Sequence, residues 1–380
     1  MIASNASTRG FWPNKEQELM LRACLLRDNE ALIAWQAWRS RVDIDTLDPG
    51  SNRLLPLLYH NLSQLEVEDP LMNRMKGIYR YYWAQNQLLF HHAAVILDIL
   101  QKNGIETMLL KGGALVLLHY GDHGLRPMGD IDILIHPDKA KLAIDLLLEA
   151  NWQMKAEWMT VEKTLKRSSA GAFVNDHGCE IDLHWNVFPQ GRQPHADDYF
   201  WSESVETKLA GVPTRCENST ELLFHVCVHG AQWSAVSPIR WIADAMIIIN
   251  SVTQEINWEH LVKQAFKRRL TLPLWKTLDY LKNNFYAPIP SSHLEELEKM
   301  HHPFIERLEY SFKYKPVGML GAFPGHCFNY FRLVEESSII QKFWGLPVYF
   351  QGLWGLNKSW KIPFFIVSKL WERLKIRFAR

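Results

Sequence analysis

The feature that most constrains the fold is the segment Asp130–Ile135, in which three isoleucines alternate with Asp130, Asp132 and Leu134. A β-strand places residues i and i+2 on one face, so the two aspartates are expected side by side, roughly 6.5–7 Å apart at Cα. The isoleucines then point into a core. Two carboxylates held this close repel each other unless a cation lies between them. The pattern therefore predicts a half-buried strand that carries a site for a hard divalent cation.

A turn and a helix precede this strand. The apolar run Thr107–Leu110 ends at Lys111-Gly112-Gly113, and the helix-compatible segment Ala114–Tyr120 follows. Two glycines let a backbone approach a ligand closely. They also open a helix whose free N–H groups and dipole favour an anion. One short segment thus predicts a phosphate-binding turn followed by a metal-binding strand.

The residues Leu110–Gly113 and Gly129–Leu134 together resemble the signature of the polymerase β-type nucleotidyltransferase superfamily, a Gly-Gly or Gly-Ser turn followed by Asp-x-Asp on a strand. The extended form, K-G-G-A and then L-R-P-M-G-D-I-D-I-L-I, is similar to the subgroup called uncharacterised nucleotidyltransferases. It is more distantly similar to antibiotic nucleotidyltransferases. The segment between Gly113 and Asp130 is long enough for a full helix and an Arg-Pro loop. This length matches the antibiotic nucleotidyltransferases better than the shortest members of the superfamily.

This resemblance implies a two-metal site for nucleotidyl transfer. Asp130 and Asp132 would hold Mg²⁺ or Mn²⁺, and the two metals of such sites lie about 3.5–4 Å apart. An NTP would bind as its metal complex. Lys111 and Arg126 would neutralise phosphate charge, and a guanidinium suits a bidentate grip. The residues expected to bind the nucleotide are Lys111, Gly112, Gly113, Arg126 and Gly129.

A hairpin is predicted further along the chain, formed by Gly171–Val174 and Cys179–Trp185. On its second strand Glu180, Asp182 and His184 share one face. A two-metal site needs a third carboxylate, and members of the resembling superfamily carry one on a later strand. The resemblance therefore assigns the third catalytic and metal-binding carboxylate to Asp182. Glu180 and His184 either neighbour the site or are simply exposed.

Helices are predicted again near Thr220–Gly230 and from Trp241 onward. His225 and His229 are four residues apart and share a helix face. Val226 stands where the zinc motif H-E-x-x-H carries its glutamate, so zinc is disfavoured. These helices resemble the helical domain that follows the catalytic sheet in the same subgroup. Three residues would then face the cleft, although a helix pair without a ligand is an equal alternative: His229, Arg240 and Asp244.

The expected fold class is α+β, a nucleotidyltransferase-type mixed sheet with flanking helices, between an N-terminal helical region and a C-terminal helical domain. Four regions are predicted: 1–103, 104–216, 217–285 and 286–380. The first is a helical region, with helices after Asn14, after Asn29, near Leu54 and from Pro70 to about Lys102. We interpret it as a support for the catalytic unit at 104–216, and the alternative is a wall of the acceptor site. The third region completes the cleft, and the fourth is an extension.

Composition limits the classes of function. The 380-residue chain has a net charge of +1, which does not favour nucleic acid as a partner. Its five cysteines are widely spaced and form no C-x-x-C pair, which argues against a disulfide framework or a zinc ribbon and fits a reducing compartment. No signal-peptide core and no run of ~20 apolar residues is present, so the expected location is cytoplasmic.

The final 24 residues form a basic, aromatic tail with seven Lys or Arg side chains and one acid, Glu372. We expect its aromatic side to pack on the domain and its charges to face solvent. The alternative is a weak contact with an anionic membrane surface. The basic residues are Lys358, Lys361, Lys369, Arg373, Lys375, Arg377 and Arg380, and the aromatic residues are Trp360, Phe364, Phe365, Trp371 and Phe378.

The predicted activity is metal-dependent transfer of an NMP from an NTP to a hydroxyl or similar acceptor, with release of pyrophosphate. The acceptor is open among small molecules, sugars, peptides and proteins. One alternative is an inactive protein of this fold, against which the presence of all three carboxylates argues. A second is an RNA-directed nucleotidyltransferase, which the near-neutral charge disfavours. A phosphotransferase is disfavoured because no kinase-type loop is present.

Overall fold

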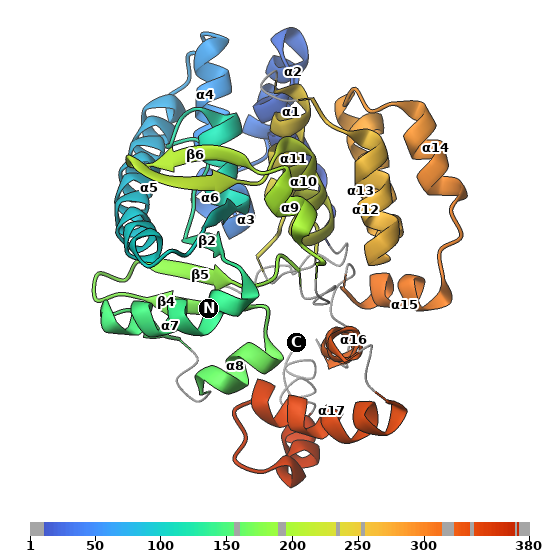
Figure 1. Ribbon diagram of the computed structural model, residues 1–380. Coiled ribbons are helices and arrows are strands. Elements are labelled where there is room, and N and C mark those ends of the chain that lie inside the picture. The colour runs from blue at the N-terminus through green and yellow to red at the C-terminus, as the bar shows by residue number, and fades with distance from the viewer. Residues whose placement is uncertain are drawn as a thin grey trace.

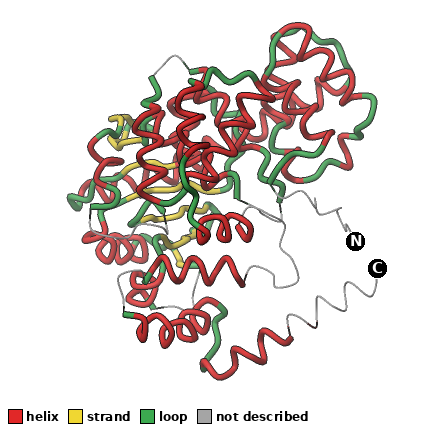
Figure 2. Tube along the Cα trace, turned by 90° about the vertical axis from the view of Figure 1, so that its right-hand side faces the viewer, coloured by secondary structure: helices red, strands yellow, loops and turns green. Residues whose placement is uncertain are grey.

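The computed structural model describes residues 11–155, 160–188, 195–232, 236–251, 255–313, 323–334, 338–368 and 371. Its centre is one seven-stranded mixed sheet with the strand order β3-β4-β5-β2-β1-β7-β6. Helices enclose this sheet (Figures 1 and 2). The α+β class with a mixed sheet is therefore confirmed. The strands are β1 (Met108–Leu110), β2 (Asp130–Leu134), β3 (Gln153–Met154), β4 (Ala170–Val174), β5 (Glu180–His184), β6 (Val205–Leu209) and β7 (Val212–Cys216).

The alternating segment of the sequence forms β2 near the middle of the sheet. Ile131 and Ile133 are fully buried, as the period of two predicts. β2 pairs antiparallel with β1 and parallel with β5. In this register Asp132 lies between Leu110 of β1 and Asp182 of β5. The predicted hairpin is also present, because β4 and β5 pair antiparallel.

The N-terminal region is helical, as predicted. Asn14 caps the first helix in a reciprocal capping box with Gln17. The predicted long helix is α5, and its buried Asn86 donates hydrogen bonds to the backbone carbonyls of His123 and Arg126. This region therefore holds the loop that leads into β2. Its helices and turns are α1 (Lys15–Leu25), α2 (Asp28–Arg39), η1 (Ile44–Thr46), α3 (Pro49–Asn52), α4 (Leu55–Gln64) and α5 (Leu71–Lys102).

Short helices and one unpredicted hairpin complete the sheet region. The hairpin β6–β7 was not expected from the sequence, and β7 pairs in parallel with β1. β3 is only two residues long and pairs antiparallel with β4 at the edge of the sheet. The helical elements here are α6 (Lys111–Leu115), η2 (Val116–Tyr120), η3 (Pro137–Lys139), α7 (Ala140–Glu149), α8 (Val161–Arg167) and α9 (Asp198–Ser202).

The rest of the described chain is helical. One buried core runs from Phe11 to Leu297 and joins the N-terminal helices, the sheet and the helices up to α14. The later helices α16 and α17 lie apart from it, below the sheet in the view of Figure 1. The elements are α10 (Ser219–His225), η4 (Val226–Gly230), α11 (Arg240–Asn250), α12 (Trp258–Arg268), α13 (Thr271–Phe285), α14 (Ser291–Lys299), α15 (Phe304–Lys313), α16 (Phe323–Leu333), α17 (Ile339–Leu353) and η5 (Ser359–Lys361).

The expected packing of the basic, aromatic tail is wrong for three of its aromatic residues. Trp360, Phe364 and Trp371 are exposed, while Phe365 is half-buried against Trp354. Helix 362–368 thus packs through one side and leaves several aromatic rings uncovered. The tail residues outside the described part are Lys369, Glu372, Arg373, Lys375, Arg377, Phe378 and Arg380.

The hydrogen bonds of Asn86 predict a stabilising role for α5 at the loop before β2. We expect Asn86→Ala to lower the free energy of unfolding by about 1–3 kcal/mol, because two carbonyls lose a buried donor. Urea unfolding followed by circular dichroism measures this change. The matched control is Gln85→Ala, one residue away and exposed. Equal stability of the two variants would contradict the role given to Asn86.

Candidate active site

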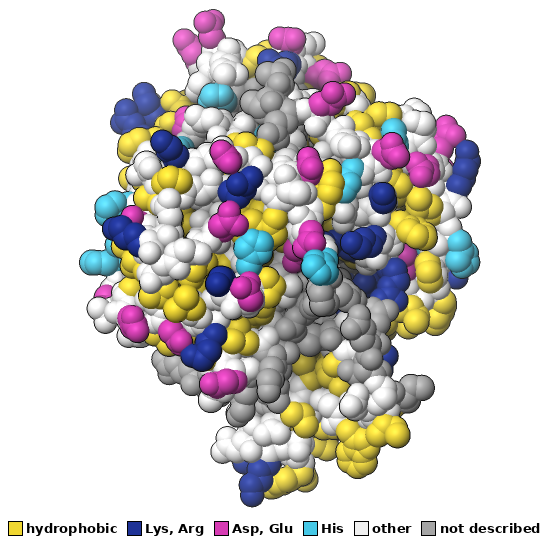
Figure 3. Space-filling model, viewed as in Figure 1, with side chains coloured by type: hydrophobic (Ala, Val, Ile, Leu, Met, Phe, Trp, Pro, Cys, Tyr) yellow, Lys and Arg dark blue, Asp and Glu magenta, His cyan; other side chains and the backbone are white. Residues whose placement is uncertain are grey.

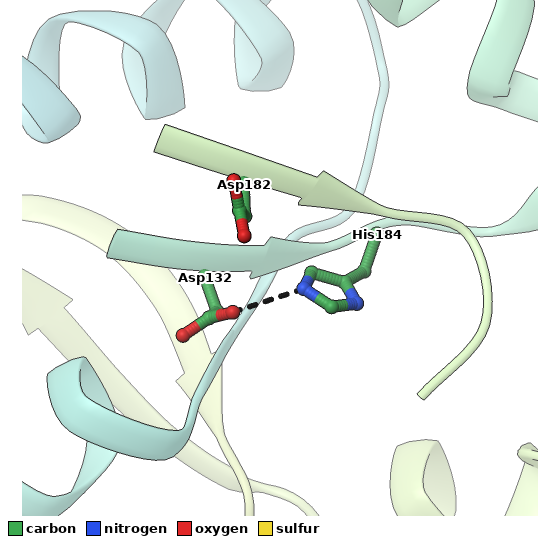
Figure 4. A group of neighbouring side chains, drawn as sticks. All are labelled: Asp132, Asp182 and His184. Atoms are coloured by element: carbon green, nitrogen blue, oxygen red, sulfur yellow. Dashed lines mark hydrogen bonds and ion pairs between the residues drawn. The ribbon is translucent and has the colours of Figure 1, made fainter. Parts of the chain in front are cut away.

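The candidate site is centred on Asp132, whose Oδ1 accepts two hydrogen bonds. Lys111 donates from Nζ at 2.5 Å, and His184 donates from Nε2 at 2.9 Å. The Asp182 carboxylate lies beside them on β5 (Figure 4). The ligand atoms of Asp132, Asp182 and His184 all lie within 4.8 Å of one another. The structure thus brings together two predicted metal ligands and one predicted neighbour of the site.

The charges of this cluster are not balanced by the protein alone. Burial disfavours ionisation of Asp132, but the positive charge of Lys111 and the His184 hydrogen bond lower its pKa. Burial and the charge of Asp132 raise the pKa of Asp182. Loss of solvent and the charges of Asp132 and Asp182 raise the pKa of Asp130 to about 6. Three carboxylates thus face one lysine, and this oxygen-rich set fits a hard divalent cation.

Asp130 is the least enclosed of the three predicted carboxylates. It lies on the same face of β2 as Asp132 but is exposed at the rim, in register with Glu180 rather than Asp182. Glu180 in turn accepts a hydrogen bond from Lys155 at 2.6 Å. The tight group at Asp132 therefore excludes Asp130, and its role as a metal ligand stays a prediction.

The Gly-Gly turn differs from the phosphate-binding turn that the sequence predicts. The residue with left-handed backbone is Lys111, at φ 46°, rather than either glycine. A Cβ on Gly112 would lie 2.5 Å from Nη1 of Arg126, so the close approach that requires glycine is to this guanidinium. Gly113 would meet only an ordinary contact with Ile131. The turn thus fixes Lys111 against Asp132 and packs Arg126 behind it.

Glu217 is a site residue that the sequence analysis missed. Its Oε2 accepts the backbone N–H of Lys111 at 2.9 Å, and its Oε1 lies 2.8 Å from Nδ1 of His225. It is fully buried, and this burial raises the pKa of Glu217 to about 8. It directly follows β7, and the alternation of Val212, Thr214 and Cys216 is the signal that could have revealed that strand. Glu217 holds the strained Lys111 backbone in place.

The histidine pair of the helix after β7 does not form a metal site among the described residues. His225 is buried and engaged by Glu217, and burial holds the pKa of His225 well below its usual range. His229 is exposed, and its ring centroid lies 5.5 Å from that of His225. In this arrangement His225 supports Glu217.

A buried ion pair joins the loop before β2 to α11. Arg126 donates from Nε and Nη2 to the two carboxylate oxygens of Asp244, at 2.8 and 2.9 Å. Tyr120 donates to the same carboxylate at 2.7 Å, and Arg240 binds the carbonyl of Pro127. Burial opposes ionisation of Asp244, but the charge of Arg126 lowers its pKa. The predicted bidentate grip of Arg126 is thus used on Asp244 in this structure.

Two cavities adjoin the site and share Arg53 and Arg240. One of about 360 Å³ is lined by Lys111, Arg126, His229 and Asp244 among others. The second, of about 470 Å³, reaches the rim of the carboxylate cluster, and its walls include Tyr82, Gly129, Asp130 and Glu180. Gly112 and Gly113 are buried and line neither cavity. Arg53 and Tyr82 belong to the N-terminal region. This region therefore forms part of the cavity wall and also holds the loop before β2.

The family model described as uncharacterised nucleotidyltransferase matches residues 50–286, which is more than half of the chain. This chain belongs to that family. The match contains the Gly-Gly turn, all three carboxylates, Glu217 and the Arg126–Asp244 pair. It begins just before Arg53 and ends before α14, so the later helices lie outside it. No curated protein matches the sequence.

Two solved structures are similar to this chain. The crystal structure of the lincosamide antibiotic adenylyltransferase LnuA, bound to lincomycin, is 17% identical, covers 41% of this chain and 93% of its own, and has a TM-score of 0.30. The crystal structure of an antigenic nucleotidyltransferase-like protein from Paracoccidioides brasiliensis is 17% identical, covers 55% and 92%, and has a TM-score of 0.35.

The buried ion pair predicts a pH-dependent loss of stability in Asp244→Asn. Removing one partner of a buried pair costs about 3–5 kcal/mol, because Arg126 keeps its charge. The lowered pKa of Asp244 means that its stabilisation is present at neutral pH and is lost as the pH falls through the acid range. Unfolding free energies of wild type and variant should therefore converge as the pH drops from about 5 to about 2.

Urea unfolding across that pH range measures this convergence, with the exposed substitution Asp138→Asn as the control. A constant gap between Asp244→Asn and wild type at every pH would contradict a stabilising charge on Asp244.

Proposed function

We propose that this protein is a metal-dependent nucleotidyltransferase that moves an NMP from an NTP to a hydroxyl or similar acceptor on a small molecule, sugar, peptide or protein. The observation that carries the proposal is the register of β2 and β5. It sets Asp132 opposite Asp182, with Lys111 of the Gly-Gly turn bonded to Asp132. Family membership over residues 50–286 supports the same reaction class.

The carboxylates are assigned to the metal. Asp132 and Asp182, with Asp130 at the rim, would hold Mg²⁺ or Mn²⁺, since carboxylate oxygens suit these ions. His184 would act as a positioning residue, because its hydrogen bond at 2.9 Å orients the Asp132 carboxylate. When bound, the metal supplies charge neutralisation at the phosphates and makes an acceptor hydroxyl more acidic.

The reacting groups follow from these assignments. The acceptor oxygen attacks the α-phosphorus, a new P–O bond forms, and the bond to the leaving pyrophosphate breaks. Asp182 takes the acceptor proton, and the support for this role is its half-buried place beside Asp132. Lys111 contributes positive charge next to the reacting phosphate. Most of the rate then comes from positioning and electrostatic stabilisation.

The remaining phosphates are assigned to the two joined cavities. Their shared residues, Arg53 and Arg240, are cations, and Lys111 and Arg126 line the first cavity beside them. Asp244 offsets only part of this positive charge. Gly129 belongs to the wall nearest Asp130, and His229 to the far wall. A cationic cavity next to a carboxylate cluster is what a triphosphate with a divalent cation requires.

The metal assignment predicts that Asp132→Asn and Asp182→Asn lose metal-dependent NTP binding and turnover. We expect turnover to fall by at least about a hundredfold to a thousandfold. Other enzymes lose about this much when one group that stabilises the transition-state charge is removed. Calorimetry with each NTP and Mg²⁺ or Mn²⁺ measures binding, and pyrophosphate release measures turnover. Removing the metal with a chelator should reproduce the variants' loss in the wild type.

The control for these variants is Glu206→Gln, an exposed carboxylate on β6 of the same sheet. Retained NTP binding in Asp132→Asn would contradict the metal assignment. Failure of the folded wild type to bind any NTP would instead favour an inactive protein of this fold.

The cavity assignment predicts that Arg53→Ala weakens NTP binding by about tenfold to a hundredfold, because one charge-assisted contact to phosphate is lost. Arg53→Lys should recover part of the affinity, since the charge returns without the fork of donors. The same calorimetry gives both values, with the exposed Arg41→Ala as the matched control. An unchanged NTP affinity in Arg53→Ala would assign this wall to the acceptor instead.

A further inference from the structure

Helix α17 turns an apolar face outward. Ile340, Phe343, Trp344 and Val348 are exposed, and Trp344 keeps 77% of its surface accessible. Their spacing places them on one side of the helix. The opposite side packs inward, where Tyr349 lies on Tyr330 with ring centroids 5.2 Å apart. A helix on the surface of a globular protein normally exposes its polar side, so this face lacks a partner within the described chain.

The next helical segment repeats this arrangement. Residues 362–368 form a helix whose inner side places Phe365 on Trp354, with ring centroids 4.9 Å apart. Phe364 and Val367 are exposed on this helix, and their spacing of three positions keeps them on one side of it. Trp360 in the preceding turn η5 and Trp371 after the helix are also exposed. Two consecutive segments therefore present large apolar side chains to solvent.

The charged residues within these two segments have one sign. The sequence from Ser338 to Trp371 contains no aspartate or glutamate and four lysines. Lys358 and Lys361 are exposed on either side of Trp360, and Nζ of Lys361 lies 6.0 Å from the centroid of the Trp360 ring. The C-terminal patch is defined here by Ile340, Phe343, Trp344, Val348, Lys358, Trp360, Lys361, Phe364, Val367 and Trp371.

The location of the C-terminal patch separates it from the nucleotide site. It lies outside residues 50–286 of the family match and outside the buried core that ends at Leu297. In Figure 3 hydrophobic side chains gather on the lowest part of the molecule, with dark-blue basic side chains beside them. None of its residues lines either cavity beside the carboxylate cluster.

We propose that the C-terminal patch binds the surface of a membrane that contains anionic phospholipids. Exposed Trp and Phe side chains favour the boundary between headgroups and acyl chains, and lysines beside them bind anionic headgroups. No helix in the described part of the chain is long and apolar enough to cross a membrane, so the contact is with the surface. A second copy of the chain fits less well, because a two-fold contact sets lysines against lysines with no acid opposite.

Co-sedimentation of the full chain with vesicles tests this proposal. We expect binding to vesicles of phosphatidylcholine mixed with phosphatidylglycerol, and much weaker binding to phosphatidylcholine alone. Raising the salt concentration should weaken the binding, since the lysine contribution is screened. Absence of binding to the anionic vesicles would overturn the proposal, and so would equal binding to both kinds of vesicle.

Two double variants separate the apolar and charged parts of the patch. Phe343→Ser with Trp344→Ser should reduce partitioning by at least tenfold, because two large side chains no longer enter the interface. Lys358→Gln with Lys361→Gln should reduce it by roughly tenfold or more on anionic vesicles only. All four side chains are outside the buried core, so the fold is retained, as circular dichroism can verify.

The matched control is Ile33→Ser with Phe266→Ser, two exposed apolar residues on α2 and α12, away from the patch. An equal loss of binding in this control would overturn the proposal, because exposed apolar surface in general would then explain it. Analytical ultracentrifugation of the same proteins tests whether the patch binds a second copy of the chain. A dimer that Phe343→Ser with Trp344→Ser dissociates would assign the patch to a second copy instead of a bilayer.

Discussion

The pairing of β2 with β5 is the constraint on which the candidate site depends. Parallel pairing in this register places Asp132 directly beside Asp182, and both carboxylates lose solvent. Ile131 and Ile133 make a shift of one residue unfavourable, because it would bury the aspartates and expose the isoleucines. The same hydrophobic alternation that builds the sheet therefore also concentrates negative charge at one point on its open face. Lys111 and His184 compensate for only part of that charge.

The residues around this point mainly hold one another in place. Glu217 holds the backbone of Lys111, and Lys111 reaches Asp132 from the turn. Arg126 packs against Gly112 and binds Asp244, which fixes α11 relative to the loop before β2. Removing one of these groups leaves another buried charge or donor unpaired, which costs more than the contact itself contributes. The site is thus a single network that spans the sheet, the N-terminal helices and the helices after β7.

The sequence predicted the parts of this network that follow from local periodicity. The strand at Asp130, the hairpin that carries Asp182, the capped first helix and the long α5 all have patterns within a few residues. The pairing of Arg126 with Asp244 joins residues 118 positions apart, and no local pattern encodes it. Glu217 was missed because its strand, β7, has only a short alternation and pairs with a distant strand, β1. The conformation of Lys111 depends on that same distant carboxylate.

The walls of the cavities bear on the acceptor more directly than the carboxylates do. The carboxylate cluster is suited to the chemistry of any NTP, and it does not discriminate among acceptors. Arg53 and Tyr82 come from the N-terminal region, and Arg240 comes from α11, so the space in front of Asp130 is bounded by elements outside the sheet. Arg53 and Arg240 also line the first cavity, where Lys111 and Arg126 add further positive charge that favours an anion.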